Sequence, residues 1–270
     1  ANNWLIEHNE FAFNAQMGMQ FYKSGGGGPS NTVSRQNYFH DNCQATGSGS
    51  SFVISYQNNI SEYDTVDLGA CTTGIAVINS SPLNNTVRHA SIYCPDASCT
   101  NGISINAAAV NTTVQNSVIL GSFANPILNN GTGSTLAGNL TSGVTASDVW
   151  TNPVSRDFTL KAGSPAIDGG TNIGGSKCGA LPDQGAFEVC GFSSASITGH
   201  TIDVTMENIY PPLQVFGPTG WSVACTPNPD ACGTPVVVSA TLLTGSGSVA
   251  RLILAGVANT DCTTDQIWKV

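Results

Sequence analysis

The sequence predicts an all-β protein in two parts, a stack of short repeated strands followed by a smaller β-sandwich. Three observations lead to this prediction. Charged residues make up only 9% of the 270 residues, against the ~25% of an ordinary globular chain. Exposed faces must therefore consist of Ser, Thr, Asn and Gly, which are poor helix formers. An Asn-containing element recurs along the first half of the chain, and alternating apolar residues occupy much of 191–270.

The same composition excludes several classes of protein. Eight Lys and Arg against 17 Asp and Glu give a net charge of -9, and so few cations cannot form the basic face that nucleic-acid binding requires. A hydrophobic content of 40% is too high for a disordered chain. No apolar run approaches the ~18 residues of a membrane helix. We therefore expect no nucleic-acid partner and no membrane span.

The repeated element is an Asn-rich stretch ending in an apolar anchor, followed by a small residue and a short alternating strand. The anchors are Phe11, Phe39, Ile60, Ile92 and Val118, and the strands are 18–21, 51–54, 74–77, 102–105 and 125–128. Their spacing is typical of solenoid repeats. Units this short cannot bury their own apolar face, so neighbours must stack. Asn suits such a stack, because its side chains can hydrogen-bond between strands about 4.8 Å apart and it tolerates left-handed backbone.

The most specific motif lies at 157–170 and 183–188, which read DFTLKAGSPAIDGG and DQGAFE. It resembles the closing segment of many bacterial extracellular β-helix proteins. Together with the repeats, it resembles the right-handed parallel β-helix of the pectate-lyase-like superfamily. The resemblance implies a β-helix over 1–190 that is closed by 157–190. Asp168 and Asp183 are expected to accept hydrogen bonds from turn amides.

The chain begins without Met, inside the structured-looking run 1–6, so we interpret the β-helix as N-terminally incomplete. Residues 191–270 differ in composition from the repeats. Alternating strands are predicted at 196–206, 236–242, 248–254 and 266–270, and about seven strand candidates indicate a β-sandwich. The pattern resembles the Ig-like modules of bacterial secreted proteins. Trp221 is then expected in the sandwich core rather than in a sugar site.

The nine cysteines indicate an oxidising compartment. They lack the accompanying His residues and the C-x2-C spacing of metal sites. We expect disulfides between the close pairs and, as a further candidate, between neighbouring turns: Cys94/Cys99, Cys178/Cys190, Cys225/Cys232 and Cys43/Cys71. Cys262 is then the free thiol. With the family resemblance, this predicts a secreted or cell-surface protein of bacterial origin.

Ionisable residues are concentrated in the first repeats. No Asp, Glu, Lys, Arg or His occurs from 97 to 147, and acid–base or metal-assisted chemistry needs such groups, so the later repeats are expected to be structural. Aligned on the Asn element, the candidate catalytic residues fall near the same turn of successive repeats: Glu7, Arg35, Glu62, Arg88 and His89. Because side chains one repeat apart lie about 5 Å apart, the sequence predicts a mixed acidic and basic ladder along a lateral groove.

A polysaccharide lyase is one activity that this ladder suggests. Such an enzyme removes the proton next to a uronic-acid carboxylate, and Arg35, Arg88 or Lys23 would be the base. Ca²⁺ would stabilise the enolate. Carboxylates are the ligands that Ca²⁺ prefers, and the candidate ligands are Asp41, Asp64 and Asp67, with Glu62 as a further one.

Two other interpretations remain open. A glycoside hydrolase would use two carboxylates from the set Glu7, Glu10, Glu62 and Asp64. Alternatively, the charges form cross-repeat ion pairs on a solvated face, each contributing ~0–1 kcal/mol. The run His40-Asp41-Asn42 is interpreted as a turn rather than as part of a catalytic triad.

The sequence thus predicts an extracellular protein that interacts with a polysaccharide or cell-surface glycan, either as a lyase or hydrolase or without catalysis. The alternative is a non-catalytic surface or structural protein that self-associates, such as an adhesin, stalk or filament subunit. The uncharged later repeats and the appended module favour this alternative. So does the absence of the Asn-Thr-Asp, Asp-Asp and Gly-His-Gly motifs of β-helix polygalacturonases.

Overall fold

The computed structural model describes residues 3–22, 28–45, 47, 49–79, 81–96, 99–174 and 180–189, and the backbone of 192–198, 201–206, 236–242 and 249–255. Ala1–Gly174 with Ala180–Val189 form one compact unit. Gly175–Gly179 with Cys190–Val270 form a second. The two units are described separately.

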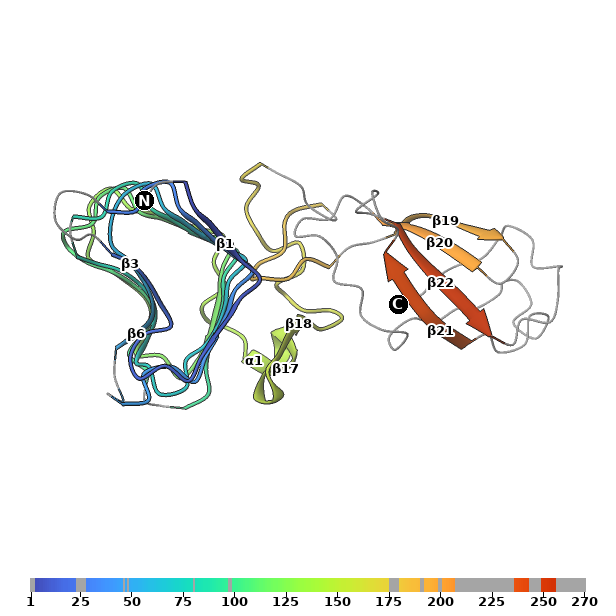
Figure 1. Ribbon diagram of the computed structural model, residues 1–270, viewed down its shortest axis with the longest axis horizontal. Helices are drawn as coiled ribbons and strands as arrows, with labels where there is room; N and C mark the ends of the chain where they lie inside the picture. Colours follow the sequence, from blue (N-terminus) through green and yellow to red (C-terminus); the bar gives the residue numbers. More distant parts are fainter. Residues whose placement is uncertain are drawn as a thin grey trace. The chain divides into compact units, whose positions relative to one another are not determined.

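The first unit is a parallel β-solenoid, in which each rung adds one strand to each of three parallel sheets (Figure 1). Sheet I contains β1 (Leu5–Glu7), β4 (Val33–Arg35), β7 (Ile60–Glu62), β10 (Thr86–Arg88), β13 (Thr113–Gln115) and β16 (Thr135–Ala137). Sheet II contains β2 (Glu10–Ala12), β5 (Tyr38–His40), β8 (Thr65–Asp67), β11 (Ser91–Cys94) and β14 (Val118–Gly121). Sheet III contains β3 (Met19–Phe21), β6 (Ser50–Ile54), β9 (Thr73–Val77), β12 (Asn101–Ile105) and β15 (Asn125–Asn129). The predicted stacking of repeats is confirmed.

Columns of apolar side chains fill the solenoid. In sheet II the interior column is Phe11, Phe39, Val66, Ile92 and Ile119, paired in register from rung to rung. The Phe39 ring stacks on that of Phe11 at 5.0 Å and on that of Phe52 from sheet III at 5.3 Å. Face-to-face rings at this spacing stabilise the stack beyond the area that they bury.

Two predicted anchors are wrong. Ile60 lies in β7 of sheet I, and Val66 takes its place in the interior column. Val118 pairs with Ser91 and belongs to a second hydrophobic core outside the solenoid, whereas its neighbour Ile119 points inward. The two errors have different causes. Ile60 was misplaced because the short strands of sheet I were not recognised. Val118 is one residue from the inward-pointing Ile119, and a shift of one residue turns a side chain to the opposite face of a strand.

Asparagine has two separate roles at the turn before sheet I. One column adopts left-handed backbone, with φ of 54° at Asn31 and Asn58, 53° at Asn84 and 54° at Asn111. The next residue points inward and links the rungs, because Asn59 Oδ1 accepts the Thr32 N–H at 3.0 Å. Asn85 Oδ1 accepts the Asn59 N–H at 2.9 Å. The two predicted properties of asparagine, bonding between rungs and left-handed backbone, are therefore confirmed and are divided between adjacent residues. The predicted single column is wrong, because only the Asn element before Ile60 lies at this turn, whereas those before Phe11, Phe39 and Val118 lie between sheets I and II.

The segment formed by residues 140–174 and 180–189, called here the closing segment, folds back over the outer face of sheet II. It contains α1 (Ala146–Val149), β17 (Trp150–Asn152), a 3-10 turn (Pro153–Ser155) and β18 (Asp157–Leu160). Trp150 and Phe158 pack against each other and against Tyr93 of β11. The segment predicted to end the solenoid thus covers its side.

The carboxylates of the closing motif bind backbone amides, as predicted. Asp183 Oδ1 accepts the N–H of Asp168 at 2.7 Å, and its Oδ2 accepts the N–H of Val189 at 2.5 Å. Asp168 Oδ1 accepts the N–H of Leu181 at 3.0 Å. The two acidic residues therefore shape the turns of the closing segment.

The described part of the second unit is one antiparallel sheet in the order β19-β20-β22-β21 (Figure 1). Its strands are β19 (Phe192–Thr198), β20 (Thr201–Met206), β21 (Val236–Leu242) and β22 (Val249–Ala255). The alternating run 196–206 spans two paired strands rather than one. Strand 236–242 is confirmed, and 248–254 is shifted by one residue. Trp221 and strand 266–270 lie outside the described residues, so the Ig-like sandwich stays a prediction.

Two of the expected disulfides are present in the described residues, Cys43–Cys71 and Cys94–Cys99. The remaining cysteines, including Cys262, lie outside them. No helix in the described part of the chain is long and apolar enough to cross a membrane.

Candidate functional site

The predicted ladder of opposite charges runs across the strands of sheet I. Glu7, Arg35, Glu62 and Arg88 are register partners on β1, β4, β7 and β10. Arg35 Nε lies 2.6 Å from Glu62 Oε1, and Arg88 Nε lies 2.8 Å from Glu62 Oε2. Arg35 Nη1 also lies 3.7 Å from Glu7 Oε2. The sequence therefore predicted these four members and their order, whereas the fifth predicted member, His89, lies elsewhere.

Glu62 is the centre of the ladder. Its side chain is only 2% exposed and is held between two guanidinium groups. Arginine stays protonated in proteins, so neither Arg35 nor Arg88 offers a lone pair that would accept a proton from a substrate. Arg88 is the more exposed of the two, and its outer edge can still donate hydrogen bonds to a ligand.

A column of uncharged side chains lies beside the ladder on the same outer face of sheet I. Its members are Leu5, Val33, Ile60, Thr86, Thr113 and Thr135, paired in register and half-buried or exposed. At about 4.8 Å a strand, six strands make a flat strip about 24 Å long. The face therefore combines charged hydrogen-bonding groups with an uncharged strip that is apolar over β1, β4 and β7 and carries threonines over β10, β13 and β16.

His89 follows the ladder in sequence but does not extend it. It adopts a φ of 50° and is buried, with its ring stacked on Tyr63 at 4.7 Å and its Nδ1 3.1 Å from the Asp183 carbonyl oxygen. Burial lowers the pKa of His89 to about 4, against the opposing effect of the Asp183 contact. The neutral ring holds the closing segment against the solenoid.

Asp64, a candidate metal ligand, lies inside the solenoid at the turn between sheets I and II, where it continues a second column begun by Asn9 and Asn37. Its Oδ1 accepts the Asn37 N–H at 2.9 Å, and its Oδ2 accepts the Ser61 hydroxyl at 2.7 Å. Desolvation raises the pKa of Asp64 to about 6. Asn37 itself accepts the Asn9 N–H at 3.0 Å, so Asp64 occupies the position that an asparagine has one rung earlier.

The other two candidate metal ligands share an arginine from the closing segment. Arg156 Nη2 lies 2.8 Å from Asp41 Oδ1, and Arg156 Nε lies 3.0 Å from Asp67 Oδ2. The Arg156 hydrogen bond lowers the pKa of Asp41, whereas burial raises that of Asp67. The guanidinium occupies the place between these carboxylates that a cation would need, so the predicted Ca²⁺ ligands do not fit one calcium site.

His40 connects this arginine to the first rung. Its Nδ1 lies 2.8 Å from Asp41 Oδ2, and its Nε2 lies 2.5 Å from Glu10 Oε1. Asp41 has a φ of 48°, as the predicted turn requires. The sequence had no signal for Arg156, which is separated from His40 and Asp41 by more than 110 residues. Only the path of the closing segment brings them together.

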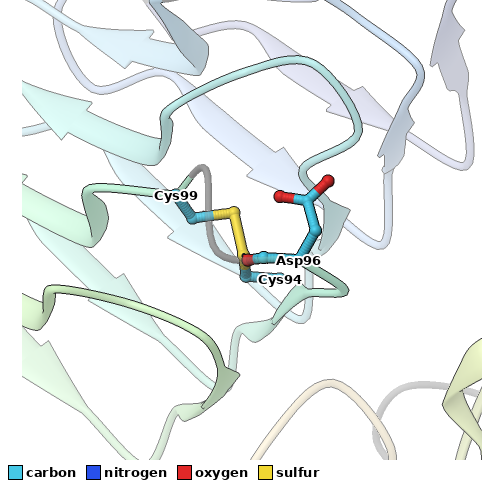
Figure 2. A group of neighbouring side chains, drawn as sticks. All are labelled: Cys94, Asp96 and Cys99. Atoms are coloured by element: carbon cyan, nitrogen blue, oxygen red, sulfur yellow. A yellow bond between two sulfur atoms is a disulfide. The ribbon is translucent and has the colours of Figure 1, made fainter.

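One group in the described residues has the ligand types of a metal site. The ligand atoms of Cys94, Asp96 and Cys99 lie within 4.8 Å of one another. Figure 2 shows that the two sulfurs are bonded to each other beside the Asp96 carboxylate. Thiolates, not disulfide sulfurs, bind metals, so this group is a structural bridge as it stands. Lys23, the third candidate base, lies outside the described residues.

Comparison with known proteins names no relative: no family model matches the chain, and neither a curated protein nor a solved structure matches it.

Proposed function

We propose that this protein is an extracellular polysaccharide-binding solenoid of the pectate-lyase-like type, and that the glycan lies along the outer face of sheet I. The carrying observation is the ladder of Glu7, Arg35, Glu62 and Arg88 beside a flat uncharged column. Sugar rings present apolar C–H faces and hydroxyl edges, and this face offers a partner for each. Charged donors and acceptors form the stronger hydrogen bonds. Two disulfides in the described residues agree with an extracellular location.

The ladder supports binding better than bond cleavage. A lyase needs a group that accepts a proton, and both arginines are protonated and ion-paired. A hydrolase needs an accessible acid beside a second carboxylate, and Glu62 is buried with both oxygens engaged. Within the ladder Glu7 alone remains accessible. Glu10, the other exposed carboxylate of the candidate hydrolase set, lies in β2 of sheet II and binds His40. The geometry therefore favours a lectin-like role on this face.

Affinity electrophoresis of the whole chain through gels that contain single polysaccharides tests the proposal. Arg88→Gln is expected to weaken binding about tenfold, which corresponds to ~1.4 kcal/mol. Lys161→Gln is the matched control, because Lys161 is an exposed cation in the closing segment. Binding retards migration through the gel. The proposal would be contradicted if Arg88→Gln and Lys161→Gln both lost this retardation, or if no polysaccharide retarded the parent protein. Reducing-end and unsaturated-uronide assays with and without Ca²⁺ test cleavage separately.

A second candidate is a structural role through self-association. In the described residues β16 and β15 end their sheets with one neighbour each, and Leu136 of β16 is 44% exposed. An uncovered strand edge can pair with another chain. Concentration-dependent assembly in analytical ultracentrifugation would favour this role, and a monomer at every concentration would count against it.

A further inference from the structure

Phe13 is the most unusual exposed residue of the first rung. Its side chain is 73% exposed, and its backbone has a φ of 56°. A bulky residue in the left-handed region is rare and strained. Asp41 has the equivalent place one rung later, because the preceding residues Ala12 and His40 are register partners. Asp tolerates this conformation. The strain at Phe13 is not offset by burial of its ring, because the side chain is largely exposed. The ring is therefore exposed at a conformational cost.

A polar side chain, that of His40, contacts this ring, and further charged groups contact His40. The Phe13 ring meets the edge of His40 at 5.6 Å. His40 in turn bridges Glu10 and Asp41, and Arg156 binds Asp41 at 2.8 Å. The Glu10 carboxylate is 66% exposed and the Arg156 side chain 40% exposed. The ring, the carboxylate and the guanidinium thus each contact His40, and all three are at least partly exposed.

The buried partners fix these groups in place. The side chain of His40 is 5% exposed and that of Asp67, which binds Arg156 Nε at 3.0 Å, is 7% exposed. Arg156 is thus held by two carboxylates and Glu10 by one imidazole nitrogen. Side chains whose positions are fixed before binding lose less conformational entropy when a ligand arrives.

We propose that Phe13, Glu10 and Arg156 form a binding subsite for a neutral polysaccharide. A sugar ring stacks its C–H face on the Phe13 ring, and its hydroxyls donate to Glu10 and accept from Arg156. Aromatic rings supply a large apolar contact at low entropic cost. The site lies beside sheet II and is separate from the ladder on sheet I. The subsite proposal rests on the proposed function in one respect, namely that the ligand is a polysaccharide.

Charge decides between neutral and acidic glycans. Three carboxylates, those of Glu10, Asp41 and Asp67, accompany one guanidinium and one imidazole. The whole chain carries a net charge of -9. A uronic-acid polymer would be repelled both locally and at long range, whereas a neutral polymer meets no such barrier.

Three variants test the subsite in the full chain. Phe13→Ala removes the ring, and Phe13→Asn also relieves the backbone, since Asn tolerates positive φ. Tyr22→Ala is the matched control, because Tyr22 is an aromatic residue 56% exposed that follows β3 of sheet III rather than β2. The probes are hydroxyethyl cellulose, galactomannan and xyloglucan, with polygalacturonate as the acidic comparison, in affinity electrophoresis and titration calorimetry.

The expected result is binding of at least one neutral probe that falls about tenfold or more in both Phe13 variants and is unchanged in Tyr22→Ala. The melting temperature of Phe13→Asn should equal or exceed that of the parent, so that lost binding cannot be ascribed to unfolding. Neutral binding that survives both variants overturns the subsite but leaves polysaccharide binding standing. Binding of polygalacturonate alone, lost in Arg88→Gln, overturns the subsite and supports the sheet I face. No binding of any probe overturns both.

Discussion

At the scale of single residues, Asp64 shows how a side chain can keep a structural pattern while changing its charge. Asn37 and Asp64 have equivalent places on successive rungs, at the turn between sheets I and II. Each lies three residues after a serine with which it shares a hydrogen bond. Asn37 donates to its serine, whereas Asp64 accepts from its own. The exchange of one amide for a carboxylate reverses a hydrogen bond and buries an ionisable group.

Asp64→Asn should therefore stabilise the protein at neutral pH. The native pKa of Asp64, about 6, lies above the ordinary value of 3.8, so the native state retains a proton that the unfolded chain has lost. The free energy of unfolding falls as pH rises between these values, by about 3 kcal/mol, and stays lower above pH 6. Asp64→Asn has no carboxyl at this position, so its free energy of unfolding should not show this fall. Urea unfolding of the parent and the variant at pH 4, 5, 6 and 7 measures the difference.

The reciprocal change is the control for this prediction. Asn37→Asp, one rung earlier, should introduce a second carboxyl into the same column and add a loss of stability as pH rises. A pH dependence that is the same in the parent and in Asp64→Asn would show that Asp64 is not the group that titrates.

At the scale of elements, the closing segment depends on one long-range ion pair. Arg156 follows the 3-10 turn with a φ of 65° and meets carboxylates from β8 and the turn after β5. Its hydrogen bond to Asp41, with the nearby charge of Asp67, raises the pKa of Arg156. The aromatic contacts of Trp150 and Phe158 with Tyr93 continue the same interface.

Arg156→Ala should loosen the closing segment before it unfolds the solenoid. The change leaves the buried Asp67 carboxylate without its guanidinium, which costs about 1–3 kcal/mol because Arg156 is itself partly exposed. Hydrogen exchange should quicken at 149–160 and remain slow in sheet III. Lys161→Ala removes an exposed cation bound to the Ser147 carbonyl oxygen. It should leave hydrogen exchange unchanged both at 149–160 and in sheet III. Uniform acceleration over all rungs would contradict this view of a separately anchored segment.

How well the sequence predicts a strand depends on the length of that strand. The strands of sheet III were predicted within a few residues because five alternating residues carry a clear period, as in β6 and β9. The strands of sheet I have only three residues, such as Val33–Arg35, too short for a period to be visible. Because these strands were not predicted, Ile60 was assigned to the interior column of sheet II, although it lies in sheet I.

At the scale of the whole molecule, the ladder was predictable and the His40 cluster was not. Glu7, Arg35, Glu62 and Arg88 repeat at nearly constant intervals, so stacking alone aligns them. The His40 cluster needs Arg156, and no repeat relates that residue to the second rung. Contacts between unlike parts of a chain depend on the path of a connecting segment, which local pattern does not encode.

The two described disulfides should stabilise the whole solenoid unequally. Cys43–Cys71 closes a loop with a sequence separation of 28, and Cys94–Cys99 one of 5. If the bridge acts by restricting the unfolded chain, the longer loop contributes about 3–4 kcal/mol and the shorter about 2. The first bridge also ties the second rung to the third, which opposes separation of rungs along the stack.

The double variants Cys43→Ala/Cys71→Ala and Cys94→Ala/Cys99→Ala measure this difference by urea unfolding. Double substitution leaves no unpaired thiol at either site, and every other cysteine is unchanged. The first variant should lose more stability than the second, by about 1–2 kcal/mol. Equal losses would show that the bridges act through local packing in the native state rather than through the length of chain that they enclose.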